Sequence, residues 1–230
     1  MIYLTGDTHI PIDVGKLDSQ EFREQKTLTR NDYVIVLGDF GLLWHEDKIY
    51  RHWLNWFRKR KFTTLWLDGN HENHEWIQEI PPARWHGGMV HYVADNIIHL
   101  GRGSIFNLEG KYFFVMGGAE SHDRYLRREG SSWWPGEIPS QEEMERGIRN
   151  IEAHHKKGLK IDYVLTHTCP SEIIEMMFQM NDENDPVTKY LDIVNDMVKD
   201  EMTGWYFGHW HFDKDFWKYH CMYYNVMRLV

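Results

Sequence analysis

Two histidines, His209 and His211, stand one residue apart after a glycine, in the segment YFGHWHFD. Imidazole is a common metal ligand, so the pair suggests a metal site. If the segment is an extended strand, both side chains point to the same face, where a half-buried strand normally carries Val or Leu. The chain has 15 histidines in 230 residues, and most of them must be ordinary surface or half-buried side chains. The assignment therefore depends on which other residues converge on the pair.

Residues that can bind metal follow five short apolar runs, which are residues 1–4, 33–37, 62–67, 163–165 and 205–207. These runs lead in turn to Asp7 and His9, to Asp39, to Asn70, to His167, and to the pair His209 and His211. Helical patterns separate several runs, which predicts an α/β fold. Ligands in such folds collect at the carboxyl ends of the strands, so we expect these residues to meet in one site.

The chemistry of this set is specific. Carboxylate and amide oxygens with imidazole nitrogens, without thiolate, suit divalent manganese, iron or zinc. Two Asp, one Asn and four His are too many ligands for one ion and about right for two, particularly if one carboxylate bridges. Two ions roughly 3.5–4 Å apart activate a water and clamp the attacking and leaving oxygens of a phosphoryl group. The set therefore predicts phosphoester hydrolysis with two divalent metal ions.

The same residues carry a family resemblance. In order, D-x-H, G-D, G-N-H-E, a histidine after an apolar run and G-H-x-H resemble the five motifs of the calcineurin-like metallophosphoesterases, and residues 117–137 resemble a segment of small bacterial and phage members. The resemblance implies two mixed β-sheets packed as a sandwich and flanked by helices. It also implies one ion on Asp7, His9 and His211, a second ion on Asn70, His167 and His209, a bridge at Asp39, and His71 beside the substrate.

From these assignments we expect direct attack on phosphorus by a metal-bridging hydroxide, with Asp39 and Asn70 holding the ions. His71 is expected to protonate the leaving group or to stabilise charge in the transition state. Arg124 and Asn70 are the expected substrate contacts, and Arg124 is the residue preferred for the phosphate. Arg127 and Arg128 in the same segment are further candidates, while Trp133 and Trp134 either stack on a base or plug the core.

The expected substrate is a small phosphoester, a phosphodiester or nucleotide. One alternative is a phosphomonoesterase like the serine/threonine protein phosphatases. That branch usually continues its second motif with Asp-Arg-Gly, but here GDFGLLWHED offers no arginine before Arg51. Another alternative is a non-catalytic, metal-stabilised interaction module, which needs neither His71 nor an arginine loop. A metallo-β-lactamase-like hydrolase would require an H-x-H-x-D-H cluster, which the sequence lacks.

Several elements must position these residues. Ser140 and Glu143 form a capping-box pattern before an apolar stripe, and Asp185-Pro186 opens a second helix. Residues 45–60 and 19–29 are weaker helix predictions. Residues 89–117 are expected to form short strands joined by turns. We expect a single domain over residues 1–230.

Composition narrows the function classes. The formal net charge of -9 argues against a grip on long nucleic acid, but two bound cations would still attract a phosphorylated substrate. No stretch resembles a signal peptide or a membrane span, so we expect a cytoplasmic protein without membrane contact. Cys169 and Cys221 are far apart and are expected to be reduced. The oligomeric state stays open.

Overall fold

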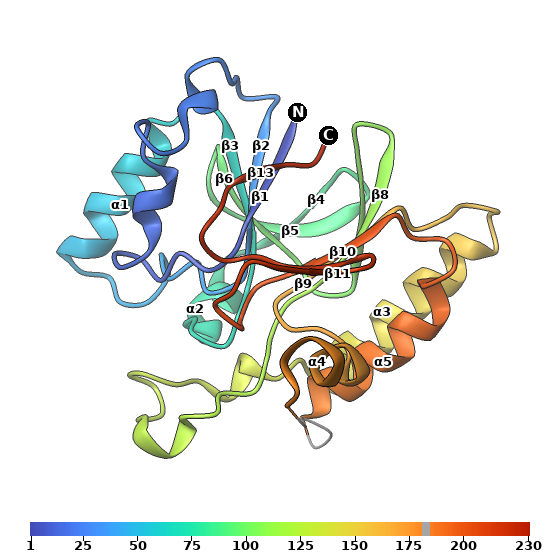
Figure 1. Ribbon diagram of the computed structural model, residues 1–230. Helices are drawn as coiled ribbons and strands as arrows, with labels where there is room; N and C mark the ends of the chain where they lie inside the picture. Colours follow the sequence, from blue (N-terminus) through green and yellow to red (C-terminus); the bar gives the residue numbers. More distant parts are fainter. Residues whose placement is uncertain (181–184) are drawn as a thin grey trace.

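Two β-sheets lie against each other at the centre of the structure, a computed structural model that describes residues 1–180 and 185–230 (Figure 1). The seven-stranded sheet has the order β13 (Met227–Arg228), β1 (Ile2–Thr5), β2 (Tyr33–Leu37), β3 (Thr63–Leu67), β6 (Ile97–Leu100), β5 (Gly88–Ala94) and β4 (Pro82–Trp85). The six-stranded sheet has the order β11 (Lys214–Phe216), β12 (Tyr219–Cys221), β10 (Gly204–Phe207), β9 (Tyr163–Thr166), β8 (Lys111–Met116) and β7 (Ser104–Leu108). Both sheets are mixed, as the family resemblance implied, with β1, β2, β3 and β6 parallel in one and β8, β9, β10 and β12 parallel in the other.

The central strands are buried on both faces. On β2, Ile35 and Leu37 face the apolar layer between the sheets, and the intervening Val34 and Val36 pack toward α1 (Lys48–Arg58). This double burial explains why the strands read in the sequence as continuous apolar runs and not as an alternation of apolar and polar residues. The burial also marks where each strand ends, because the chain becomes polar where the second sheet and the helices no longer cover the strand.

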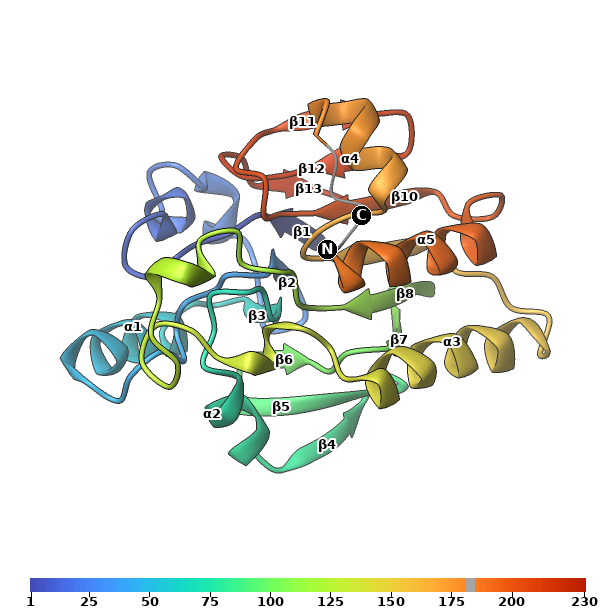
Figure 2. The same cartoon turned by 90° about the horizontal axis from the view of Figure 1, so that it is seen from below.

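Helices flank the sandwich on both sides (Figure 2). Helix α1 and the short α2 (His74–Glu79) lie with the first sheet, and α3 (Gln141–His155), α4 (Ser171–Phe178) and α5 (Pro186–Val198) lie with the second. The capping box predicted from Ser140 is present, and Asp185 caps α5. Residues 89–117 form strands and turns, as predicted.

The weak helix prediction for residues 19–29 is wrong. The region holds one short 3-10 turn, Arg23–Lys26, and a second, Val14–Leu17, precedes it. Its buried apolar residues, Leu17, Phe22 and Leu28, are spaced by five and six positions, which does not produce the stripe of an α-helix.

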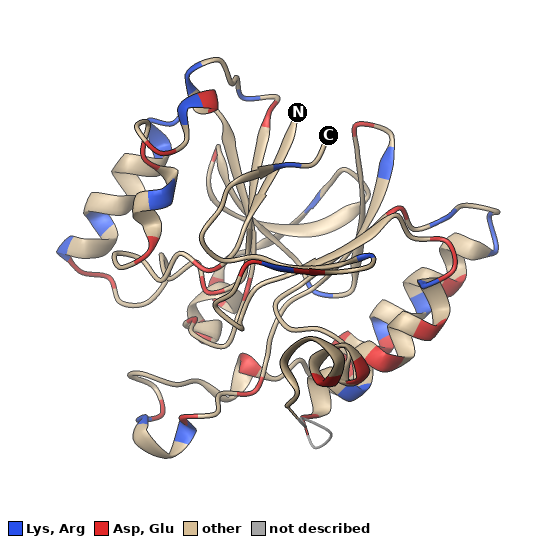
Figure 3. Cartoon of the chain, in the orientation of Figure 1, with Lys and Arg blue, Asp and Glu red and all other residues tan. Residues whose placement is uncertain are grey.

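Figure 3 shows charged residues of both signs along α3 and α5, whereas the charged residues of α1 are all basic and those of α4 are all acidic. Among the described residues, no helix is long and apolar enough to cross a bilayer. Cys169 and Cys221 are both buried, and neither forms a disulfide within the described part of the chain.

Candidate metal centre

The loops after β1, β2, β3, β9 and β10 bring the seven predicted ligands together at one edge of the sandwich. Because these strands are parallel within their sheets, their carboxyl ends all lie at this edge. Strand β10 ends at Phe207, so His209 and His211 lie in a loop and not in a strand. The expectation that a strand presents both histidines on one face is therefore wrong, since the loop turns them toward two different groups of side chains.

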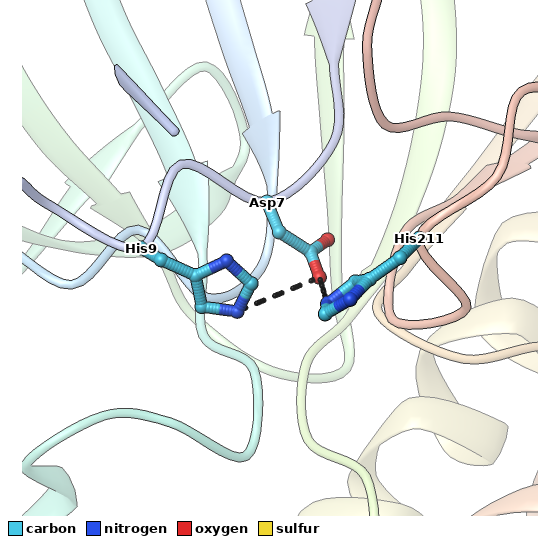
Figure 4. Close-up of side chains that lie close together, drawn as sticks. All are labelled: Asp7, His9 and His211. Carbon is cyan, nitrogen blue, oxygen red and sulfur yellow. Dashed lines mark ion pairs between the residues drawn. The ribbon is translucent and has the colours of Figure 1, made fainter. Parts of the chain in front are cut away.

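The first group surrounds Asp7 (Figure 4). Oδ2 of Asp7 lies 3.1 Å from Nε2 of His211 and 3.9 Å from Nε2 of His9. Asp7 is fully buried, His9 is mostly buried and His211 is half-exposed, so this side of the site opens to solvent. The three ligand atoms lie close enough together to hold one metal ion.

The second group surrounds Asn70. Its Oδ1 lies 3.0 Å from Nε2 of His167 and 3.0 Å from Nδ1 of His209. One oxygen thus meets two imidazole nitrogens from a different sheet. The three residues are those that the family resemblance implied for a second ion.

Asp39 lies between the two groups and faces each with one oxygen. Its Oδ2 lies 3.2 Å from Nε2 of His9, and its Oδ1 lies 3.4 Å from Nε2 of His167. The backbone N–H of His71 also donates to Oδ1 of Asp39, at 2.7 Å. This is the placement that a bridging carboxylate requires.

Four of the seven predicted ligands have a left-handed backbone, with φ of 34° at His9, 47° at Asp39, 67° at His209 and 54° at His211. This conformation is uncommon for residues other than glycine and costs on the order of 1–3 kcal/mol at each position. Strain of this kind persists where the surrounding structure enforces it, and it clusters at functional sites.

Two glycines allow the carboxylates to lie against neighbouring loops. A Cβ atom at Gly69 would collide with Oδ1 of Asp39, and a Cβ atom at Gly208 would collide with Oδ1 of Asp7. Each carboxylate therefore occupies the space that a side chain would take.

Hydrogen bonds behind the ligands fix their orientation. Nδ1 of His167 lies 2.8 Å from the carbonyl of Leu37, and Nδ1 of His9 lies 2.8 Å from Asp13. The amide nitrogen of Asn70 donates to Ser121, at 3.1 Å, so that its oxygen faces the histidines. Such outer contacts set the tautomer and direction of a ligand.

A buried ionic cluster around Asp68 lies directly next to the Gly69–Asn70 turn. The Asp68 carboxylate accepts hydrogen bonds from Arg102, at 2.9 Å from Nε, and lies 3.0 Å from Nε2 of His99. Glu72 ties this turn to the next loop, because its carboxylate accepts the N–H of Phe40 at 2.7 Å. Burial and the neighbouring carboxylates hold the pKa of Glu72 well above its usual range.

Electrostatics favour ionised carboxylates in the centre. Burial alone would raise the pKa of Asp39, but the adjacent His167 and His9 hold it well below its usual range. Burial conversely disfavours charged imidazoles, yet the carboxylates raise the pKa of His9 and of His167 to about 9. Burial lowers the pKa of His209 to about 3. Metal binding here competes with protons on two histidines, so metal affinity should rise with pH.

These residues fit a metal centre. Oδ2 of Asp7 is buried without a hydrogen-bond partner among the described residues, and two imidazole nitrogens face it. A buried acceptor in this state is costly unless a cation or a donor satisfies it. The donor set of carboxylate, amide and imidazole is the one predicted from the sequence for divalent manganese, iron or zinc.

His71 stands beside the centre, with its ring against the segment 117–137. Nη2 of Arg127 lies 3.2 Å from Nε2 of His71, and Asp123 holds Arg127 through two hydrogen bonds of 2.6 Å. Burial lowers the pKa of His71, and the Arg127 charge adds to this shift. Arg124 is exposed and lies over the ring of Trp133, 4.1 Å from its centroid. Arg127, and not Arg124, is thus the arginine that contacts His71.

Trp133 and Trp134 are buried, at 6% and 1% exposure, so the interpretation of these rings as base-stacking surfaces is wrong. The segment 117–137 projects from the end of β8, yellow-green in Figures 1 and 2. Its tryptophans anchor it, with Trp134 packed edge-on against Trp44, 4.9 Å between ring centroids. The anchored segment delivers Ser121 to Asn70 and Arg127 to His71.

Two clefts meet at this centre. The larger, of about 540 Å³, is lined by residues that include His9, His71, His211 and Arg127. The smaller, of about 350 Å³, is lined by Asp39, Asn70, His209 and residues of the loops around them. His71 and His211 line both clefts. A group bound at the centre can therefore extend in two directions.

Sequence reasoning missed Asp13 and Ser121, and it assigned no role to Glu72 of the G-N-H-E motif. Asp13 lies four residues after His9, and an acidic residue at that distance is a weak signal for an imidazole partner. Ser121 and its own partner Glu137, 2.5 Å away, lie 16 residues apart, and nothing in the sequence relates them to Asn70.

Two comparisons relate this chain to known proteins. A sequence profile described as calcineurin-like phosphoesterase matches residues 1–213. A lariat debranching enzyme of Danio rerio is 28% identical over 180 residues, which cover 69% of this chain and 30% of that protein. Lariat debranching enzymes of Homo sapiens and Gallus gallus are 30% and 27% identical over 62% and 75% of this chain, and 27% and 33% of their own lengths.

The matches thus span about a third or less of each relative. The profile, by contrast, covers most of the chain and includes every predicted ligand, from Asp7 to His211. The chain therefore belongs to the calcineurin-like phosphoesterase family.

Proposed function

We propose that this chain is a metal-dependent phosphodiesterase with two divalent ions, manganese, iron or zinc, acting on small phosphodiesters or nucleotides. The observation that carries the proposal is the position of Asp39, with one oxygen toward the Asp7 group and the other toward the Asn70 group. In this proposal residues 1–230 act as one domain. Asp7, His9 and His211 hold one ion, Asn70, His167 and His209 hold the other, and Asp39 holds both.

Two bound ions would supply an activated water and neutralise the phosphoryl oxygens. The chain's own residues do the rest. Asn70 holds its oxygen in the centre, because Ser121 fixes its amide nitrogen. His71 would stabilise the leaving oxygen at the junction of the two clefts, or protonate it after its imidazole has taken up a proton, which the lowered pKa of His71 disfavours near neutral pH. Arg127, oriented by Asp123, meets a phosphoryl oxygen beside His71.

The two clefts favour a diester over a monoester. A phosphodiester carries two ester groups, and each can occupy one cleft while the phosphorus stays at the centre. A monoester fills one cleft and leaves the other to water, so it gains less binding free energy. This is our reason to rank the phosphomonoesterase activity second. Because the relatives are lariat debranching enzymes, a lariat also belongs among the substrates to test.

The first prediction tests metal dependence and substrate class together. With added manganese, the chain should hydrolyse an aryl phosphodiester faster than the matched aryl phosphomonoester. A chelator should abolish both activities, and manganese should restore them. Elemental analysis should find up to two ions per chain. Full activity after chelation, with at most one ion bound, would rule out the two-metal proposal, and a faster monoester would select the second candidate.

The second prediction compares two neighbouring arginines. Arg127→Met should lower kcat/KM for the aryl phosphodiester by about 10- to 100-fold, because a charge-assisted hydrogen bond to the phosphoryl group is lost. Arg124→Met, in the same segment, should change kcat/KM by less than about twofold, as expected for an exposed cation away from the centre. The reverse order would return the phosphate contact to Arg124, as predicted from the sequence.

A further inference from the structure

The larger cleft is lined by side chains of two kinds. His71 and Arg127 line it together with His9 and His211 of the metal centre. Apolar and aromatic side chains, here called the apolar wall, line it as well and include Ile12, Ile49, Trp44 and Tyr50. Its volume of about 540 Å³ falls in the usual range for ligand pockets, about 300–1,000 Å³.

The apolar wall is open to solvent. Ile12 is 80% exposed and Ile49 is 50% exposed, although both line a cleft that leads to the reaction site. The Trp44 ring is half-buried and is held edge-on by Trp134. Exposed apolar side chains beside a polar centre are typical of a ligand surface, because a ligand that covers them removes apolar area from water.

The charges of the cleft say what kind of ligand can cover this wall. Among the described lining residues, Arg127 is the single arginine or lysine, and it lies beside His71. Asp47 also lines the cleft and caps α1 by accepting the N–H of Tyr50, at 2.9 Å. A second phosphate near Asp47 would meet a carboxylate, with no further lining cation to pair with. The apolar wall therefore favours an apolar group that carries no negative charge.

We propose that the larger cleft binds a nucleobase on one ester group of the phosphodiester, with the base against Trp44, Ile12 and Ile49. A nucleobase is aromatic and uncharged, and its amino groups can donate to carboxylates such as Asp47. The inference rests on the proposed function for the position of the phosphorus. It adds that one substituent of the substrate is a nucleoside.

The test compares two substrates that differ in one base. A dinucleoside monophosphate and an analogue that lacks one of its bases carry the same phosphodiester, so the ratio of their kcat/KM values measures base recognition. Base stacking on an aromatic side chain corresponds to about 5- to 150-fold in binding. We expect the ratio for the unaltered chain to fall in this range, and Trp44→Leu to bring it close to one.

Two exposed isoleucines, one in the cleft and one outside it, provide a control for loss of folding. Ile49→Asp places a charge in the cleft, and Ile193→Asp places the same charge on α5, at 56% exposure instead of 50%. We expect Ile49→Asp to reduce the ratio by about tenfold and Ile193→Asp to leave it unchanged. Equilibrium dialysis measures the binding of adenosine to the metal-free chain, with ribose as the control that lacks a base. Without metal there is no turnover, and adenosine should bind more weakly to Ile49→Asp than to the unaltered chain.

The outcomes separate this inference from the proposed function. If the chain hydrolyses both substrates equally and binds adenosine no better than ribose, the nucleobase assignment is wrong while phosphodiesterase activity stands. If adenosine binds and Ile49→Asp weakens it, but no phosphodiester is cleaved, the cleft assignment stands and the proposed function fails. Oligonucleotides of increasing length serve as a third class of substrate. If the cleft is part of a surface that binds a nucleic acid strand, kcat/KM should rise with oligonucleotide length, and if it binds a single nucleoside, kcat/KM should stay constant.

Discussion

His71→Ala is expected to lower kcat by about 10²- to 10⁴-fold while both metal ions remain bound. The reason for retained metal is structural. The contact from His71 to the proposed bridge Asp39 comes from the backbone N–H, which alanine keeps. The imidazole faces Arg127 and the amide of Asn70, so its loss removes a group at the reacting phosphate and no predicted ligand. Metal content and rate should be measured on the same samples.

The leaving group decides what His71 does. If His71 donates a proton, the defect should shrink for a nitrophenolate ester, because this group leaves without protonation. His209→Ala is the contrasting variant, since its Nδ1 lies at Asn70 within the second group. It should lose one ion and regain activity as the metal concentration rises. A metal-depleted His71→Ala, or an equal defect for good and poor leaving groups, would exclude the assigned role.

Asp39→Asn is expected to weaken both ions at once. Asparagine keeps the shape of the side chain but removes the negative charge that faces both ligand groups. Loss of an outer partner of a ligand typically costs about 10- to 100-fold in metal affinity, and loss of a shared ligand charge should cost each ion about 100-fold or more. Titration of metal into the metal-free variant, followed by calorimetry, measures both sites.

Two controls accompany this variant. His9→Ala should weaken mainly the ion of the Asp7 group, which His9 faces. Asp123→Asn makes the same chemical change within the smaller cleft, where the side chain pairs with Arg127, and should leave both affinities within about twofold. Two tight sites in Asp39→Asn would show that the bridge lies elsewhere.

The alternation of strand and helix patterns predicted the α/β class, and the family resemblance implied the two-sheet sandwich. The convergence of the ligands was predicted by one rule, that polar residues after parallel strands meet at one edge. Strands such as residues 33–37 are buried on both faces, so the change from apolar to polar residues in the sequence predicted where they end. What the rule does not contain is loop geometry. Nothing in the spacing of His209 and His211 encodes two left-handed residues.

Specific contacts between side chains could also not be predicted from the sequence. Arg124 and Arg127 are equivalent as isolated residues, and the difference arises because Asp123 pairs with Arg127 while Trp133 holds Arg124. The segment that carries them has no periodic pattern, so its path depends on where its tryptophans are buried. Such packing is visible only in three dimensions.

The contact of Gly69 with Asp39 and of Gly208 with Asp7 has a consequence for how the chain can vary. Where the Cβ position of a glycine is open, as at Gly15, a side chain can be added without a collision. Here a single added methyl group at either glycine would displace a carboxylate that faces two or more imidazoles. Random mutagenesis of this chain should therefore find these two empty positions as intolerant as the acids they face, and a redesign that enlarges the site must begin elsewhere.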